Sequence, residues 1–585
     1  MLIRPLAALL LFALLPMEQA PARVPTPPAA EGGIVSAADP RAAAAGVEIL
    51  RAGGSATDAA IAMMLALNVV EPQSSGISGG GFLLHYDAKS GTTDSFDGRE
   101  AAPAAADAHW FYAPDGTPLS HSAAIPGGRS VGVPGNLAMM ALAHHMHGRL
   151  PWARLFQPAI RLARDGVAIT PRLHEELARY GAHITGWGRT QYFEADGVTP
   201  KPVGTILRNP ELADLFGQIA AKGPAYFYAG PPAAKLVATV DGAELHPSKM
   251  SFADLANYHA KDRPPVCGTY RVWRVCGMGP PSSGGWTVLA ILKLLERFDL
   301  GKLGKDSPVA WHLIAEAERL AYADRDMYLA DSDFVSVPLA GLSDPAYLAA
   351  RSALISPDRT MASVAPGDPA GAPPRIKVAP RETPGTTHMA VADAQGDIAE
   401  VTSTIEGPFG SGLTMDGLFL NNELTDFDIV PDKDGYLVAN RVEGGKRPRS
   451  SMAPTIVYGP DGAVRIAIGA AGGATIIAQV AKALIGVLDW HLSAQQAIAL
   501  PLIFAPGPTA YVEQGTSLEA MVPALEALGQ QVKILPMGLK ANAIERVNGH
   551  WVGAADPRSE GVAMAEDGTI TRPPPAAVPA GAPSE

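Results

Sequence analysis

Cysteine is almost absent from this chain of 585 residues, which contains only Cys267 and Cys276. Neither has a histidine or an acid beside it, so a thiol nucleophile or a cysteine-based zinc site is not expected. The two cysteines flank the strand-like segment 268–275. Two interpretations remain open: a cross-strand disulfide in a hairpin, or a pair of buried, unreactive thiols.

Charged residues are also scarce, at 18% of the chain, and positive charge is in deficit. The formal net charge is −12 and no basic cluster offsets it, which argues against nucleic acid or an anionic membrane as a partner. No metal-ligand cluster stands out, and the glycines 79–81 lack the Lys-Ser/Thr ending of a phosphate loop. We therefore predict no metal and no other cofactor for this protein, whose 47% hydrophobic content is typical of a well-packed globular fold.

Long apolar runs are missing too. The run from Leu6 to Leu15 follows Arg4 and precedes Ala20-Pro21-Ala22, a pattern typical of a secretory signal peptide and too short for a membrane span. We predict a signal peptide over residues 1–22 and a soluble protein exported to the periplasm or the exterior, with no membrane anchor. A retained signal anchor is the alternative.

What the chain does contain is a Gly-Thr-Thr-His step at residues 385–388. A threonine hydroxyl is a weak nucleophile at neutral pH, but a free α-amino group on the same residue, with a pKa of about 8, can act as its base. Cleavage of the Gly385–Thr386 bond would create that amine. Gly385 suits such a cleavage because it permits unusual backbone angles. The alternative is that Thr386 simply begins a strand.

The sequence that follows predicts a β-hairpin. Residues 386–392 alternate, 393–397 supply a turn, and 398–404 are rich in β-branched side chains. If the turn is symmetric about Gln395, Thr404 lies opposite Thr386, with Cβ atoms about 4.5–5.5 Å apart. The Thr404 hydroxyl could then orient the Thr386 hydroxyl.

Helical and strand patterns alternate in blocks, which predicts an α+β protein. Helices are expected over most of 41–70, with Ser55 or Thr57 capping the second of two, over much of 137–221, and over 311–327 and 476–490. Strands are expected at 82–86 and 92–96 and through much of 386–470. The Pro-rich stretch 363–384 predicts a mobile loop, and residues 571–585 a disordered tail.

Nine short motifs, taken in order, resemble the γ-glutamyltranspeptidase family of N-terminal nucleophile hydrolases. They are Gly54-Ser55-Ala56-Thr57-Asp58-Ala59-Ala60, Glu71-Pro72 through Gly81, Val133-Pro134-Gly135, Pro281-Ser282-Ser283-Gly284-Gly285, Asp324-Arg325, Thr386-Thr387-His388, Asn421-Asn422-Glu423, Lys446-Arg447-Pro448-Arg449-Ser450-Ser451-Met452 and Asp556-Pro557-Arg558. The resemblance spans about residues 33–558.

This resemblance implies a four-layer αββα sandwich with two stacked antiparallel sheets, made as a precursor that cuts itself. The large subunit would be 23–385 and the small, catalytic subunit 386–585. Thr386 would be the nucleophile and Thr404 its supporting threonine. The N–H groups of Gly472 and Gly473 would stabilise the oxyanion, although the two glycines also fit a tight turn.

The resemblance also implies how the donor is recognised. Arg99 matches the arginine that binds the α-carboxylate of a γ-glutamyl group, and its alternative role is a surface ion pair. Ser450 and Ser451 match the hydroxyls at the same carboxylate. Glu423 and Asp426 match the positions that hold the α-ammonium group.

Three features depart from typical transpeptidases and resemble the branch that includes cephalosporin acylases. Glu406 replaces an asparagine, adding an acid near the ammonium site. Residues 470–475 read Ala-Ala-Gly-Gly-Ala-Thr, and the loop between Asp426 and Lys446 is short. These departures affect acceptor and donor preference more than the nucleophile.

The leading hypothesis is a self-processing enzyme that takes the γ-glutamyl group from glutathione or related amides and passes it to water or to an amino acid or peptide. The short loop favours hydrolysis over transfer. The second hypothesis is an acylase for glutaryl or β-lactam side-chain amides, and the third is a secreted scaffold without activity. Burial of two acids opposite an uncharged chain counts against the acylase.

Overall fold

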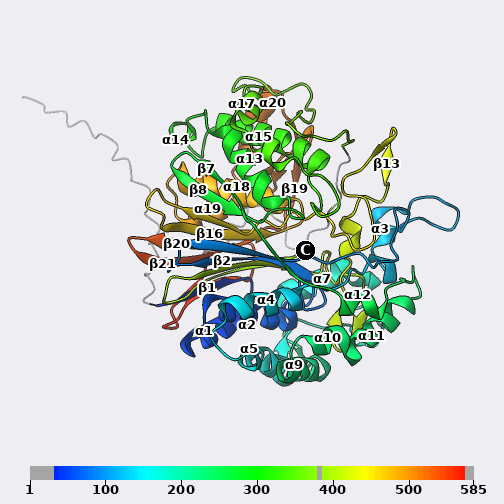
Figure 1. Cartoon of the computed structure of the whole chain (residues 1–585). Coiled ribbons are helices and arrows are strands. Elements are labelled where there is room, and N and C mark those ends of the chain that lie inside the picture. The colour runs from blue at the N-terminus through cyan, green and yellow to red at the C-terminus, as the bar shows by residue number, and fades with distance from the viewer. Residues whose placement is uncertain (1–31, 378–381, 383–384, 574–585) are drawn as a thin grey trace, which may run out of the picture.

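A computed structural model describes residues 32–377, 382 and 385–573 of the chain. The predicted signal peptide, residues 1–22, lies outside these ranges, as do 574–585 of the predicted tail. Two antiparallel sheets of eight and six strands stack on one another, and helices cover the outer face of each (Figure 1). This confirms the predicted α+β class and the αββα layer order.

The larger sheet has the strand order β23-β22-β1-β9-β10-β2-β3-β6, and the hairpin predicted from the sequence lies at its centre. Neighbouring strands are antiparallel throughout. The bounds are β1 Ile34–Ala37, β2 Gly80–Asp87, β3 Thr92–Gly98, β6 Lys261–Arg263, β9 Thr387–Ala392, β10 Ile398–Thr404, β22 Val562–Ala565 and β23 Ile570–Thr571. Strand β23 thus includes Thr571, the first residue of the tail expected to be disordered.

The smaller sheet has the order β21-β20-β16-β15-β8-β7 and is also antiparallel. Its strands are β7 Val266–Tyr270, β8 Trp273–Gly277, β15 Thr455–Tyr458, β16 Val464–Ala471, β20 Lys540–Val547 and β21 His550–Ala555. Gly469 on β16 lets the two sheets approach closely, because a Cβ there would lie 2.3 Å from the ring of His388 on β9.

Two groups of helices cover the sheets (Figure 1). On the larger sheet lie α1 Pro40–Arg51, α2 Ala56–Val70 and α4 Asn136–His147, and α5 Trp152–Leu155 and α9 Pro210–Lys222 pack outside them. On the smaller sheet lie α13 Gly284–Leu295 and α18 Thr475–Leu488, and α15 Pro308–Tyr328 packs on α13. Of the two predicted caps, Ser55 is the one that caps α2, through a capping box with Asp58. Within the described ranges, no helix is both long and apolar enough to cross a membrane.

Shorter elements fill the connections. The helices are α3 His121–Ala124, α6 Gln157–Asp165, α7 Pro171–Tyr180, α8 Gly186–Tyr192, α10 Ala225–Ala229, α11 Pro231–Asp241, α12 Phe252–Ala256, α14 Leu300–Leu303, α16 Leu339–Leu342, α17 Pro345–Ser352, α19 Ala494–Ala499 and α20 Val522–Ala527. The strands are β4 Val167–Ala168, β5 Ile206–Leu207, β11 Thr414–Met415, β12 Leu418–Phe419, β13 Asp432–Lys433, β14 Tyr436–Leu437, β17 Ile503–Phe504, β18 Thr509–Glu513 and β19 Gln531–Leu535.

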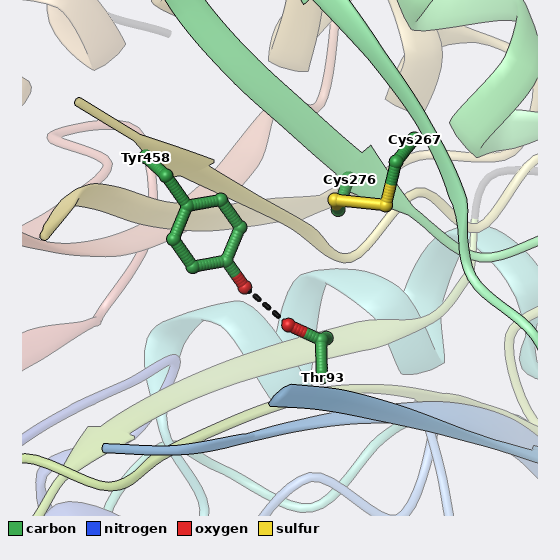
Figure 2. Close-up of a disulfide and its surroundings, with 4 residues drawn as sticks. All are labelled: Thr93, Cys267, Cys276 and Tyr458. Atoms are coloured by element: carbon green, nitrogen blue, oxygen red, sulfur yellow. Dashed lines mark hydrogen bonds between the residues drawn. A yellow bond between two sulfur atoms is a disulfide. The ribbon is translucent and has the colours of Figure 1, made fainter. Parts of the chain in front are cut away.

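Figure 2 shows two side-chain links, one between the two sheets and one between the edge strand of the smaller sheet and its neighbour. The hydroxyls of Thr93 on β3 and Tyr458 on β15 are hydrogen-bonded at 2.5 Å, which links the two sheets directly. Cys267 and Cys276 face each other in the β7–β8 hairpin and form a disulfide. The structure therefore agrees with the first interpretation of the two cysteines, a cross-strand disulfide.

Candidate active site

Thr386 lies immediately before β9, at the predicted cleavage point, and only 5% of it is exposed. Its φ of 82° is in the left-handed region, which a β-branched residue adopts at a cost of about 1–3 kcal/mol. The preceding residue, Gly385, leaves no room for a side chain, because a Cβ there would lie 1.7 Å from the carbonyl oxygen of Glu406. The Gly385–Thr386 peptide bond is therefore held in a strained, tightly enclosed backbone.

The hydroxyls of Thr386 and Thr404 are hydrogen-bonded at 3.1 Å. The pairing of Ser403 with Thr387 gives the register of the hairpin, and Thr386 and Thr404 are the next residues outward. The Thr404 oxygen also accepts a hydrogen bond from the N–H of Glu406 at 2.8 Å. The predicted register is thus confirmed, and Thr404 is in place to orient the Thr386 hydroxyl.

The two residues after Thr386 are held by buried polar partners. Thr387 donates to Glu71 at 2.9 Å, and Glu71 in turn accepts from Lys540 at 3.1 Å. His388 contacts Glu400 at 2.7 Å, where burial lowers the pKa of the imidazole to about 3 and raises the pKa of the carboxyl well above its usual range. His388 is therefore a neutral structural residue that fixes the start of β9.

A small cavity of about 20 Å³ lies beside the Thr386 side chain. Its lining brings together almost all of the site residues predicted from the sequence. The lining residues are Arg99, Glu382, Thr386, Thr404, Glu406, Glu423, Asp426, Ser450, Ser451, Met452, Gly473 and Ile476. The two exceptions, Gly385 and Gly472, border a second cavity of about 120 Å³ instead.

One corner of the cavity, the Arg99 corner, is formed by Arg99 and three carboxyl groups. The guanidinium, 1% exposed, donates to Glu423 and, at 2.5 Å, to Asp426, while Glu100 lies 4.0 Å away. Burial of three acids around one cation raises the pKa of Glu423 well above its usual range, that of Asp426 to about 6 and that of Glu100 to about 7, although Arg99 opposes each shift. The predicted carboxylate-binding arginine is thus paired with the predicted ammonium-binding acids.

This pairing differs in two ways from what the sequence suggested for Arg99. The alternative to a ligand contact was an ion pair at the surface, whereas the observed ion pair is buried. The guanidinium also donates to the carbonyls of Pro448 and Arg449, at 3.1 and 2.9 Å. Arg99 therefore connects the end of β3 to the 448–449 loop and donates four hydrogen bonds to the protein.

Arg325, Glu382 and Ser451 form a second group, the Arg325 corner, in which Glu382 and Ser451 line the cavity and the arginine bonds to both without lining it. The sequence analysis gave Arg325 no role. Arg325 on α15 has no exposed side-chain surface, and its Nη2 donates to Ser451 at 2.6 Å and to Glu382 at 2.5 Å. Its Nε donates to Ser283 at 2.8 Å and its Nη1 to Asp326 at 2.9 Å. The signal available in the sequence was the motif Asp324-Arg325, which was quoted for the family resemblance without a role.

Glu382 was also missed, although it is the only acid between Asp368 and Gly385. Met452 and Ile476, which complete the cavity wall, carried no signal beyond their hydrophobicity. Glu406 was predicted and is present: it is 4% exposed, has a φ of 74°, and accepts a hydrogen bond from the side chain of Asn422 at 2.5 Å. The structure therefore adds one acid, Glu382, to the predicted pocket, together with the arginine that bonds to it.

The two glycines predicted at the oxyanion site lie in the turn between β16 and α18. Both have positive φ, 134° for Gly472 and 57° for Gly473. Their carbonyls accept from the N–H groups of Thr475 and Ile476, at 3.3 and 3.1 Å, as α18 begins. Gly473 therefore forms part of the tight turn and also lines the cavity beside Thr386.

Comparison with known proteins agrees with this arrangement. The family model described as Gamma-glutamyltranspeptidase matches residues 42–566. Glutathione hydrolase proenzymes of Escherichia coli (strain K12) and Bacillus subtilis (strain 168) are 36% and 35% identical to the chain, each aligned over 91% of both sequences. Acylase ACY 1 proenzyme of Pseudomonas sp. (strain SE83) is 34% identical over 93% of this chain and 96% of its own.

Solved structures give the same two classes of relative. A cephalosporin acylase from Bacillus halodurans superimposes with a TM-score of 0.81 at 26% identity, covering 95% of this chain and 99% of that one. A chain of the γ-glutamyltranspeptidase of Helicobacter pylori gives 0.54 at 34% identity, covering 56% of this chain and 93% of that one.

Proposed function

Because this chain belongs to the γ-glutamyltranspeptidase family, we propose that it is a self-processing enzyme that removes γ-glutamyl groups from glutathione and related amides. The observation that carries the proposal is the strained Thr386, whose hydroxyl is hydrogen-bonded to Thr404 at the wall of a pocket lined by Arg99 and several acids. Processing would divide the chain into subunits 23–385 and 386–585, and the signal peptide 1–22 would direct it out of the cytoplasm.

The first step is self-cleavage. The Thr386 hydroxyl oxygen attacks the carbonyl carbon of Gly385, the C–N bond between the two residues breaks, and the amine takes up a proton. Water then hydrolyses the resulting ester, leaving a carboxylate on Gly385 and a free α-amine on Thr386. Relief of the left-handed Thr386 conformation favours this direction.

Turnover repeats the same chemistry on a donor. The α-amine accepts the proton of the Thr386 hydroxyl, which attacks the donor's γ-carbonyl, and the leaving amine takes that proton. The N–H groups of Gly472 and Gly473 would stabilise the oxyanion, a contribution of typically a few kcal/mol. Water or an acceptor amine then releases the γ-glutamyl group from the ester.

The acids of the Arg99 corner suit a donor ammonium group. One oxygen of Glu423 and one of Asp426 are buried without a hydrogen-bond partner among the described residues, so each can still accept from a ligand. Glu406 adds negative charge at the same cavity. These features favour a γ-glutamyl donor over one with no ammonium group.

An acylase acting on glutaryl or β-lactam side-chain amides is the second candidate, and one observation favours it. Arg99 already neutralises part of the charge on Glu423 and Asp426, so a donor without an ammonium would not leave these acids unpaired. The sequence argument against an acylase is weakened by this contact. Both candidates use the same nucleophile and the same processing.

Release of p-nitroaniline from γ-glutamyl and glutaryl anilides separates the two candidates. We expect kcat/KM to be at least about tenfold higher for the γ-glutamyl anilide, which corresponds to about 1.4 kcal/mol from the ammonium contact. Thr386→Ala should release nothing from either. A preference for the glutaryl anilide would overturn the γ-glutamyl assignment in favour of the acylase.

The fate of the acyl group is a separate question. The segment between Asp426 and Lys446 carries only the small hairpin β13–β14, whose residues are exposed, so we propose that water reaches the ester and hydrolysis exceeds transfer. Adding a dipeptide acceptor to the anilide assay should raise the rate of p-nitroaniline release by less than about twofold. A several-fold increase would indicate a transferase instead.

A further inference from the structure

The second cavity, of about 120 Å³, lies on the other side of the predicted cleavage point from the first. Gly385 and Gly472 line the second cavity, whereas the residues that follow them, Thr386 and Gly473, line the first. Consecutive Cα atoms are about 3.8 Å apart, so the two cavities come within about one residue of each other at both steps. A donor amide with its acyl half in the first cavity therefore has its amine half beside the second.

One wall of the second cavity is a polar face of α7. The residues of this helix that line the cavity are Arg172, Glu176, Arg179 and Tyr180. Spacings of three and four residues keep side chains on one side of an α-helix. Leu173 and Leu177, on the adjoining side, are buried in a separate hydrophobic cluster. The helix thus presents its charged side chains to the cavity.

Two polar groups of the lining have hydrogen-bonding capacity that the protein does not use. Among the described residues the Arg172 guanidinium makes no hydrogen bond, and its Nη2 lies 3.8 Å from Glu176 Oε1, beyond hydrogen-bond distance. Gln73, 3% exposed, lines the cavity from the loop after α2, and its Oε1 has no partner within the described ranges. Leaving a buried polar group without a partner costs about 1–3 kcal/mol, so the cavity wall is suited to a polar ligand.

Positive charge exceeds negative charge around the second cavity. Arg172, Arg179 and Lys540 line it, and Glu176 is the only acid among the described lining residues. Lys540 donates to Glu71 at 3.1 Å, so the charge of that lysine is already balanced. Burial raises the pKa of Glu176, although Arg172 opposes the shift, so this acid is a weak counter-ion for the two arginines. A carboxylate would balance the remaining charge and suits a guanidinium, which can donate two parallel hydrogen bonds to it.

We propose that the second cavity binds a carboxylate carried by the amine half of the donor, with Arg172 as its main ligand. This inference rests on the proposed function, because it requires Thr386 to attack an amide. It leaves recognition of the acyl half to the Arg99 corner. The substrate class that it names is amides whose leaving amine is an amino acid or a short peptide, and it makes Arg172 a specificity-determining residue.

Paired donors that differ only in this carboxylate test the proposal on the processed wild type. Glutathione and γ-glutamylglycine, each compared with its C-terminal carboxamide, place the carboxylate at two distances from the reacting amide. We expect kcat/KM for glutamate release to be at least about tenfold higher for the acid in one pair or both. Equal values for acid and carboxamide in both pairs would overturn the proposal.

Arg172→Met tests whether this arginine is the ligand. The ratio of kcat/KM between acid and carboxamide should fall to about one, because only the acid loses a contact. A general effect of the substitution on folding cancels in this ratio. Arg161→Met, which removes a surface ion pair of α6 with Glu48, is the matched control and should keep the wild-type ratio. An unchanged ratio in Arg172→Met would overturn the role of Arg172.

Failure of the inference and failure of the proposed function give different results. If the wild type released glutamate from no donor, the proposed function would be wrong, and calorimetry with alanylglycine and its carboxamide would still decide the inference. Tighter binding of the acid that Arg172→Met abolishes would support it, and equal binding would overturn it. If γ-glutamyl donors were turned over with no preference for a carboxylate on the leaving amine, only the inference would be wrong.

Discussion

Arg99 lines the cavity and Arg325 bonds to two of its lining residues, but the ion-pair partners of the two arginines lie in different parts of the chain. Arg99 is paired with Glu423 and Asp426, which follow the predicted cleavage point in the chain. Arg325 is paired with Glu382, which precedes the predicted cleavage point by only a few residues. The Arg99 corner thus joins segments on the two sides of the predicted cleavage point, whereas Arg325 and Glu382 both lie before it.

Both arginines are neutralised by acids, because burying a guanidinium without a counter-ion is expensive. The pairs of Arg99 reach across the predicted cleavage point. The pairs of Arg325 with Glu382 and Asp326 lie entirely before it.

The largest effect is expected from removing Arg99, whose ion pairs reach across the predicted cleavage point. Arg99→Met would leave Glu423 and Asp426 buried without their cation, and loss of one partner of a buried ion pair costs about 3–5 kcal/mol. We expect the urea midpoint of the uncut Thr386→Ala chain to fall accordingly. Lys261→Met, which removes an exposed ion pair with Asp333, should cost at most about 1 kcal/mol.

A loss of less than about 1 kcal/mol in Arg99→Met would contradict this assignment. It would mean that the three acids are protonated in the folded protein and need no cation. The Arg99 corner would then contain no ion pairs.

The second largest effect is expected on the selectivity between donors with and without an ammonium group. Asp426→Asn removes a charge that faces the donor ammonium, so KM for the γ-glutamyl anilide should rise by about 10- to 100-fold, or about 1.4–2.8 kcal/mol. KM for the glutaryl anilide should stay within about threefold, because that donor has no ammonium group. Glu443→Gln, an exposed acid in the same loop region, is the control. Equal losses for both donors would show that Asp426 acts through Arg99 alone.

The smallest effect is a pH dependence of that selectivity. The pKa values of Asp426 and Glu100 are raised to about 6 and about 7, so both carboxyls become neutral as the pH falls through this range. The neutral forms attract an ammonium group less, so the ratio of kcat/KM between γ-glutamyl and glutaryl anilides should fall by up to about tenfold from pH 8 to pH 5. Titration of the Thr386 amine affects both donors and cancels in the ratio.

A ratio that stays constant over this range would place the titrating carboxyls away from the donor. A ratio that rises as the pH falls would mean that the protonated forms bind the ammonium donor better, which the geometry of the Arg99 corner does not allow.

The hairpin at Thr386 was predictable because its information is local. Alternation and a symmetric turn set the register of β9 and β10, and Ser403 opposite Thr387 confirms it. Ser55 as the cap of α2 is local in the same sense. The layer order required the family resemblance, since no local pattern reveals how two sheets stack.

Pairings between distant segments could not be predicted. The sequence named Arg99, Glu423 and Asp426 as pocket residues, but not that they would bind one another across more than 300 positions. Arg325 and Glu382 are 57 residues apart and their contact depends on how α15 lies against the 448–452 loop. Composition and spacing predict which chemical groups are present, while their charge balance is decided by packing.

The central claim is that the Thr386 hydroxyl cuts the bond before its own residue and thereby gains the amine that activates it. Intact-mass spectrometry of the purified, active wild type tests this most directly. The account predicts two chains, the smaller beginning at Thr386, and a single uncut chain for Thr386→Ala. An undivided wild-type chain that retains full turnover would contradict it.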